Sequence, residues 1–269
     1  MTPAALVLAA HGSDVEPSVN EQVRACAAAA GARGRFAEVA AAFHRGDPPF
    51  SRVLDQLVAH EAVVVPLMTS VGYYSDVVLP RALAKCATYA TKRVQVTRPV
   101  GTHPRLRSLV AERVRRLMRR HGLAGNETTL ALIGHGTPRH GRSRDATLDL
   151  ANRLGADGLC AAVRVAFLDD DPPVETLLDE LETPNVVVEP FLMSDGPHTT
   201  QDIPRRMGNA MQNAECRVQN AGANADSRKV SAGAGRVVID SAVGTDPGMA
   251  DLVIDLADRA LRHTVEAPW

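Results

Sequence analysis

The residues of this chain best suited to chemistry are histidines that end short apolar runs. Residues 130–134 lead to His135, which stands between two glycines in the sequence Gly-His-Gly-Thr. Apolar runs of this length bounded by glycine are typical of buried strands. Because ligands bind at the carboxyl ends of strands in an open α/β sheet, we expect His135 to face a ligand. The same pattern occurs at residues 5–13, around His11.

The repetition extends over the whole chain. His11 and His135 are 124 positions apart (135 − 11), and other pairs keep this offset without a gap. They are Ala42–Phe43 with Ala166–Phe167, the Asp-Pro-Pro sequences at 47–49 and 171–173, Pro66 with Pro190, Gly72 with Gly196, and Pro80–Arg81 with Pro204–Arg205. The chain is therefore predicted to be a tandem duplication, with repeats at 1–122 and 123–269.

Each repeat is predicted to alternate strands and helices. In the first repeat we expect strands at 5–10, 36–43, 62–68 and 94–98, and helices at 18–30, 49–60, 76–87 and 104–120. In the second we expect strands at 129–133, 162–167, 185–192 and 236–240, and helices beginning near Ser143, Pro173, Asp202 and Pro247. This order predicts an α/β protein of two flavodoxin-like lobes, each a four-stranded parallel sheet with helices on both faces. Extra residues in the second repeat are predicted to form an inserted loop at 220–235, because its composition is typical of loops or disorder.

The composition argues against several classes of protein. A net charge of −1 gives no general attraction to nucleic acid or to an anionic membrane. No apolar run approaches the roughly 20 residues that span a bilayer. The four cysteines form no CxxC pair, so they suggest neither a zinc nor an iron–sulfur pattern. We expect a cytoplasmic protein with no nucleic-acid or membrane partner.

The second repeat carries more residues suited to metal or proton chemistry than the first. His198 follows its third strand, where the first repeat has Tyr74, and Asp169 follows its second strand. Because the carboxyl ends of parallel strands meet at one edge, His135, Asp169 and His198 are expected to face one centre. Two imidazoles and a carboxylate suit Fe²⁺, Co²⁺, Ni²⁺ or Zn²⁺, and histidine also accepts protons near neutral pH.

Each of these residues also has a structural interpretation. His135 fits a strand-end histidine bonded to the backbone, and Asp169 fits a solvated acidic turn. The first repeat has no histidine at position 74 to act with His11, so His11 is expected to be structural or to face a substrate. His44 aligns with Leu168, so we expect it to point inward.

Three sequences taken together at their observed separation, GHGT, AFLDDDPP and EPFLMSDGPHTTQDIP, resemble the class II tetrapyrrole chelatases. The specific resemblance is to the sirohydrochlorin cobaltochelatase/ferrochelatase family in its long, duplicated form, and it covers the chain apart from 220–235. It implies that His135 and His198 bind the incoming metal and accept pyrrole protons. It also implies a catalytic role for Asp169, where the family usually has glutamate. Tyr74 makes the first repeat the one with the degenerate site.

The same resemblance implies a lyase-class chelatase that inserts Co²⁺ or Fe²⁺, or also Ni²⁺, into a sirohydrochlorin-type tetrapyrrole in cobalamin or siroheme biosynthesis. No cofactor beyond this substrate metal and no iron–sulfur cluster is expected. Because the tetrapyrrole carries carboxylates, cationic side chains are expected to bind it. The candidates are Arg139, Arg142, Arg144, Arg205 and Arg206, with His11 and Tyr74 as further substrate contacts. Solvated surface positions are the alternative for each arginine.

Other classes of protein explain less of the sequence. A non-catalytic metal or tetrapyrrole carrier would use the same histidines. A nucleic-acid-binding protein would use the arginine-rich face of 104–120, but the near-neutral charge and the lack of interleaved aromatics argue against it. A serine or cysteine hydrolase is not indicated, because the sequence contains no GxSxG turn.

Overall fold

The computed structural model describes residues 4–137, 141–179, 181–212, 216–219, 227–232 and 235–265. The chain forms two compact units, which we call the first lobe (Met1–Leu106 with Thr245–Trp269) and the second lobe (Arg107–Gly244). No helix in the described part of the chain is both long and apolar enough to cross a membrane.

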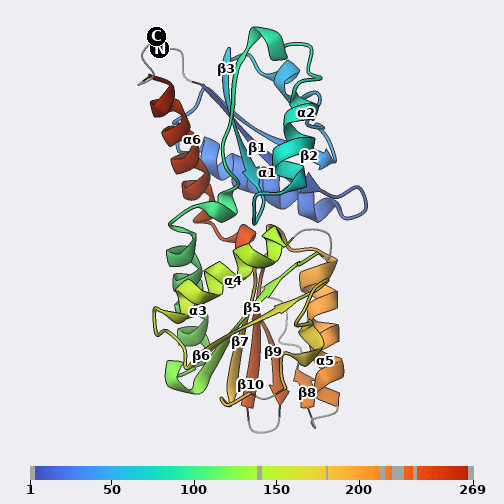
Figure 1. Ribbon diagram of the computed structural model, residues 1–269, viewed down its shortest axis with the longest axis vertical. Helices are drawn as coiled ribbons and strands as arrows, with labels where there is room; N and C mark the ends of the chain where they lie inside the picture. The colour runs from blue at the N-terminus through green and yellow to red at the C-terminus, as the bar shows by residue number, and fades with distance from the viewer. Residues whose placement is uncertain are drawn as a thin grey trace. The chain divides into compact units, whose positions relative to one another are not determined.

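The first lobe is built on a four-stranded parallel sheet. Its order is β2-β1-β3-β4, and the strands are β1 (Ala5–Gly12), β2 (Glu38–Arg45), β3 (Glu61–Leu67) and β4 (Arg93–Val96). One face packs on a 3₁₀ turn, Val53–Gln56, and on α2 (Leu79–Leu83). The helices α1 (Pro17–Gly31) and α6 (Met249–Val265) pack with the sheet and with each other, as the blue α1 and dark red α6 show (Figure 1).

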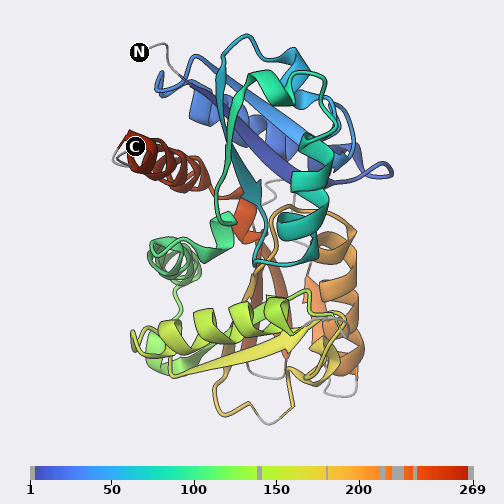
Figure 2. The same cartoon turned by 45° about the horizontal axis from the view of Figure 1, so that its top comes forward.

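The second lobe repeats this parallel sheet and extends it. The strands β5 (Thr128–Gly134), β6 (Ala162–Phe167), β7 (Asn185–Pro190) and β10 (Gly235–Asp240) are parallel in the order β6-β5-β7-β10. Its helices include α3 (Leu106–His121), α5 (Ile203–Gln212) and α4 (Arg142–Gly155), and Figure 2 shows α4 running alongside β6. The predicted two-lobed α/β fold is thus confirmed.

The predicted loop at 220–235 was wrong for its described residues. Residues 227–232 form β9 (Ser227–Ala232), which pairs antiparallel with β10, and β8 (Cys216–Gln219) pairs antiparallel with β9. The reason is that β10 would otherwise present a row of unpaired backbone N–H and C=O groups at the sheet edge. Gly235 begins β10, and residues 220–226 and 233–234 of the predicted loop lie outside the described residues.

The helices predicted at 49–60 and from Pro173 were also wrong in extent. Among the described residues of these two segments, the helical structure is limited to the 3₁₀ turns Val53–Gln56 and Val174–Thr176. In the first lobe Phe43 donates its N–H to Pro48 and accepts from Phe50, and in the second lobe Phe167 donates to Pro172. These bonds hold the proline segments extended against the strand ends, so no full helix starts.

The compact lobes do not coincide with the sequence repeats expected at 1–122 and 123–269. Helix α3 comes from the first repeat but, apart from Leu106, it belongs to the second lobe. Helix α6 comes from the second repeat but belongs to the first lobe. The two repeats therefore exchange their last helices.

A buried ion network anchors α3 in the second lobe. The Nε atom of Arg113 lies 2.7 Å from Glu189 Oε1. The Nη2 atom of Arg113 lies 3.0 Å from Asp240 Oδ2 and also donates to the Ser241 carbonyl at 2.7 Å. Arg113 and Glu189 are both buried. Burial raises the pKa of Glu189 well above its usual range, and the Arg113 charge opposes that rise. The first repeat has Val65 at the position of Glu189, so its sheet lacks this carboxylate.

A different polar pair anchors α6 in the first lobe. His103 Nε2 lies 2.7 Å from Asp255 Oδ2 of α6, and the Arg105 backbone N–H donates to His103 Nδ1 at 3.0 Å. Because Nδ1 accepts, the ring proton is on Nε2 and points at Asp255. Burial lowers the pKa of His103, so this neutral form is the favoured one.

We expect Arg113→Ala to destabilise the protein by about 3–5 kcal/mol, because it leaves the Glu189 carboxyl group buried without its cation. The measurement is urea unfolding. Arg119→Ala is the matched control on the same helix, since its pair with Glu112 is solvent-exposed and should contribute less than about 1 kcal/mol. Equal losses in the two variants would show that the Arg113 network does not anchor α3.

Candidate functional site

The candidate site of the second lobe lies where three adjacent parallel strands end. Strand β5 is central, and its last residues pair in register with the ends of both neighbours, Gly134 with Phe167 of β6 and Ile133 with Pro190 of β7. The chain leaving β5 carries His135, the chain leaving β6 carries Asp169, and the chain leaving β7 leads to His198. The strand register therefore brings all three predicted residues to one edge.

A glycine turn fixes the position of His135. Gly136 has a φ of +71°, and a Cβ atom there would lie 2.5 Å from the Asp170 Cβ, so only glycine fits. The Asp169 backbone N–H donates to the His135 carbonyl at 2.8 Å and holds the two loops together. His135 Nδ1 lies 3.0 Å from the Gly136 carbonyl and 3.4 Å from Asp169 Oδ2. A carbonyl oxygen only accepts, so Nδ1 carries the proton and Nε2 presents its lone pair.

His198 begins a π-helical turn, His198–Asp202, that leads into α5. The Ile203 N–H bonds to the His198 carbonyl, which defines the π-helical turn, and residues four apart on a helical surface are neighbours. The buried Thr199 fixes the start of the turn, because its hydroxyl accepts from the Gly196 N–H and donates to the Gly196 carbonyl, both at 3.0 Å. The first lobe has the same turn at Tyr74–Val78.

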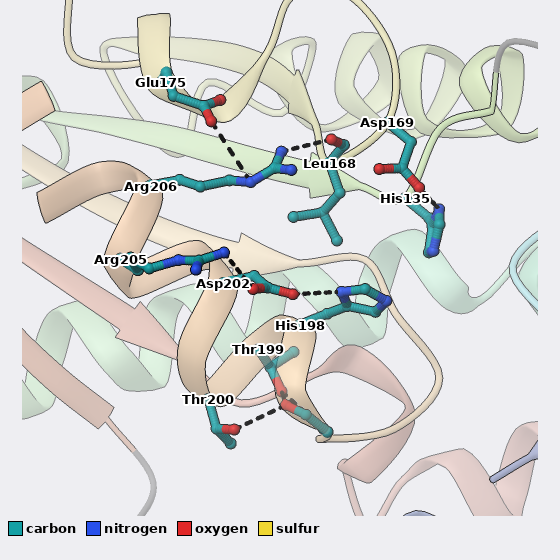
Figure 3. Close-up of polar contacts among 11 residues, drawn as sticks. His135, Leu168, Asp169, Glu175, His198, Thr199, Thr200, Asp202, Arg205 and Arg206 are labelled. Atoms are coloured by element: carbon teal, nitrogen blue, oxygen red, sulfur yellow. Dashed lines mark hydrogen bonds and ion pairs between the residues drawn. The ribbon is translucent and has the colours of Figure 1, made fainter. Parts of the chain in front are cut away.

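Asp202 holds the imidazole of His198 in one orientation (Figure 3). His198 Nδ1 lies 2.9 Å from Asp202 Oδ2, and Arg205 donates to the other carboxylate oxygen at 2.9 Å. An ionised carboxylate only accepts, so Nδ1 carries the proton and Nε2 again presents its lone pair. Sequence reasoning missed this role of Asp202, although its spacing of four from His198 was visible. The first lobe has Val78 at this position.

The two imidazole rings lie next to each other at this edge of the sheet. Their ring centroids are 5.1 Å apart and the rings are nearly perpendicular, at 85°. Both side chains are about half exposed, at 44% for His135 and 50% for His198. In the part of the chain that is described, no group of three or more His, Cys, Asp or Glu side chains is arranged to hold a metal ion. The pair is therefore an open two-nitrogen site and does not resemble a closed structural metal centre.

The expected substrate-binding arginines have different surroundings. Arg142 is exposed at the start of α4, and Arg205 is largely exposed beside Asp202. Arg144 lies 3.4 Å from Asp170 Oδ1 and over the Phe167 ring. Arg206 donates to the Leu168 carbonyl and pairs with Glu175 at 3.5 Å, so it braces the loop after β6 (Figure 3). Arg139 lies outside the described residues.

The first lobe brings its own expected residues together. His11 and Tyr74 have ring centroids 4.7 Å apart, and His44 lies 5.2 Å from His11 and 5.1 Å from Tyr74. The expectation that His44 points inward was wrong, because its side chain is exposed whereas Leu168 is buried. The reason is that β2 continues in register to Arg45, beyond the core, whereas β6 ends at Phe167.

The fold is that of a duplicated α/β protein whose two repeats exchange their last helices. One sheet edge of the second lobe carries an open pair of imidazoles, which is a candidate metal site. The chain belongs to the CbiX family, whose sequence pattern matches residues 5–117 and again residues 129–260. A relative from Halobacterium salinarum, named a probable sirohydrochlorin cobaltochelatase, is 33% identical over 273 residues, which are 94% of this chain and 90% of the relative.

Solved structures share the fold. SirB from Bacillus subtilis with Fe³⁺ superposes with a TM-score of 0.75 at 17% identity, covering 98% of each chain. A multi-domain protein from Deinococcus radiodurans, described as structurally similar to chelatases, superposes with a TM-score of 0.75 at 24% identity. That match covers 96% of this chain but only 55% of the longer Deinococcus protein.

We expect Arg206→Ala to lower the free energy of unfolding by about 1.5–3 kcal/mol, because it removes charged hydrogen bonds that hold the Leu168 loop. Arg205→Ala is the adjacent control and should cost less than about 1 kcal/mol, since its pair with Asp202 is exposed. Thermal and urea unfolding measure both. A loss in the Arg205 variant as large as that in the Arg206 variant would contradict the bracing role.

Proposed function

We propose that this protein inserts a divalent metal, Co²⁺ or Fe²⁺, into a sirohydrochlorin-type tetrapyrrole, and that His135 and His198 carry the reaction. The family and the name of the Halobacterium relative support the class of reaction. The observation that carries the assignment to the second lobe is the pair of imidazoles 5.1 Å apart, each with its Nδ1 beside a carboxylate.

The chemistry of insertion needs what this pair supplies. Two pyrrole N–H protons leave the macrocycle as the metal enters it. A neutral imidazole first binds the metal through its Nε2 lone pair and, once the metal has left, accepts a proton at the same atom. Because only two imidazoles hold the ion, it remains transferable, unlike an ion held by four protein ligands.

The carboxylates have supporting roles in this proposal. Asp202 and Asp169 lie at the Nδ1 side of His198 and His135, away from the nitrogen that would bind the metal. A carboxylate in that position fixes the tautomer and the orientation of the imidazole, and it stabilises the imidazolium that forms on proton transfer. We therefore propose that Asp169 orients His135 and helps proton transfer rather than binding the metal.

Arginines near the pair are proposed to bind the tetrapyrrole carboxylates. Arg142 and Arg205 are exposed in the same lobe and suit bidentate carboxylate contacts, and Arg139 is proposed with them from its sequence position. Co²⁺, Fe²⁺ and Ni²⁺ all accept imidazole ligands, so metal supply decides which ion reacts. The product would serve cobalamin or siroheme biosynthesis.

We expect His135→Ala and His198→Ala each to slow metal insertion by about 100-fold or more, the usual effect of removing a general base. The measurement is anaerobic absorbance of sirohydrochlorin with Co²⁺ and, separately, Fe²⁺, corrected for the spontaneous rate. His60→Ala, an exposed histidine of the first lobe, is the control and should keep the wild-type rate. Wild-type rates in either site variant would overturn the assignment to the second lobe.

We expect Asp202→Asn to weaken metal binding or activity by about 10–100-fold, because this carboxylate fixes the tautomer and orientation of His198. The readouts are the Co²⁺ affinity and the pH profile of insertion. Asp149→Asn is the control, since Asp149 pairs with Arg153 at the same spacing of four on a helix of the same lobe. Asp202→Glu should restore part of the loss, and an unchanged pH profile in Asp202→Asn would argue against the role.

A further inference from the structure

The first lobe carries a compact ring cluster that the proposed reaction does not use as a metal site. Its members are His11 at the end of β1, His44 at the end of β2, and Tyr74 in the π-helical turn. Every pair among the three has ring centroids between 4.7 and 5.2 Å apart. His11 and His44 are exposed and Tyr74 is 40% exposed, so an ion from solvent can reach them.

The sheet register fixes the two histidines side by side. Strands β1 and β2 are parallel, with Ala10 paired to Phe43 and Gly12 paired to Arg45. His11 and His44 occupy the step between these pairs, and partners in a parallel ladder project to the same face. Gly12 has a φ of +70°, and a Cβ atom there would lie 2.2 Å from the Arg45 carbonyl, so the strand ends are tightly joined.

We propose that His11 and His44 form a second binding site for a divalent transition-metal ion, beside the phenol of Tyr74. Two imidazole nitrogens bound at about 2.0–2.1 Å with a tetrahedral angle place their ring centroids about 5 Å apart. The His11 and His44 centroids are 5.2 Å apart, close to the 5.1 Å of His135 and His198. Both pairs therefore have a spacing compatible with two ligands of one ion.

The site shares one position with its second-lobe counterpart, since His11 is the repeat equivalent of His135, but its second histidine comes from a different strand. The second lobe takes its two histidines from the end of β5 and from the turn after β7. The first lobe has Tyr74 in place of the second of these and gains His44, where the second lobe has the buried Leu168. In the first lobe the second histidine of the pair therefore comes from the strand on the other side of the central strand.

The ligand set indicates which ions would bind. Imidazole suits Zn²⁺, Cu²⁺ and Ni²⁺ better than Mg²⁺ or Ca²⁺, which prefer oxygen. The Tyr74 ring borders both imidazoles, and in this proposal the two imidazoles supply the metal ligands. Arg45, next to His44, is paired with Asp14 at 3.2 Å, which offsets its repulsion of a cation.

The test measures metal binding without tetrapyrrole, so its outcome is independent of chelatase activity. The tag-free His135→Ala/His198→Ala double variant lacks the second-lobe pair and is titrated with Ni²⁺ and Cu²⁺ by calorimetry. It is expected to bind one ion, with Cu²⁺ tighter than Ni²⁺. The Cu²⁺ electron paramagnetic resonance spectrum should show coupling to two imidazole nitrogens.

The substitution His44→Leu in this double variant introduces the residue that the second lobe has at the equivalent position. We expect it to weaken binding of the ion by at least about tenfold, and His11→Ala to do the same. His60→Ala is the matched control, an exposed histidine of the same lobe that should leave the affinity unchanged. The proposal is overturned if the double variant binds no ion, or if its ion is retained at the same affinity after His44→Leu.

Discussion

Parallel strand pairing is the constraint on which both candidate sites depend. A parallel sheet brings the carboxyl ends of neighbouring strands to one edge, and side chains distant in sequence then meet there. In the second lobe β5 is paired on both sides, so His135, Asp169 and the turn containing His198 converge. In the first lobe the pairing of β1 with β2 continues to Arg45, and that longer ladder brings His11 beside His44.

Local backbone features then fix the geometry of the site in the second lobe. Gly136 allows the turn that directs His135, and the π-helical turn after β7 places Asp202 beside His198. Both imidazoles have Nδ1 at an oxygen and therefore present Nε2. The exchanged helices depend on separate polar contacts, since Arg113 in α3 and Asp255 in α6 fix which sheet each of these helices covers.

Much of this was predictable from sequence because it rests on repetition and periodicity. The constant offset of 124 residues predicted two α/β lobes, and apolar runs ending in glycine located the strands and His135. The helix exchange was not predictable, because it depends on buried partners such as Glu189 that a linear pattern does not pair with Arg113. The exposure of His44 was missed because alignment with Leu168 assumed strands of equal length. The Asp202 contact was missed because hydrophobic periodicity does not reveal a polar pair, although a spacing of four residues allows one on a helix.

The central claim is that the second lobe catalyses metal insertion and does not merely carry metal or tetrapyrrole. The most direct measurement is the number of metal–tetrapyrrole molecules formed per protein chain, followed anaerobically with sirohydrochlorin and Co²⁺ in large excess over protein. The account predicts many turnovers per chain at a rate well above the spontaneous reaction. A product yield that stops at one equivalent per chain would contradict it and would identify the protein as a stoichiometric carrier.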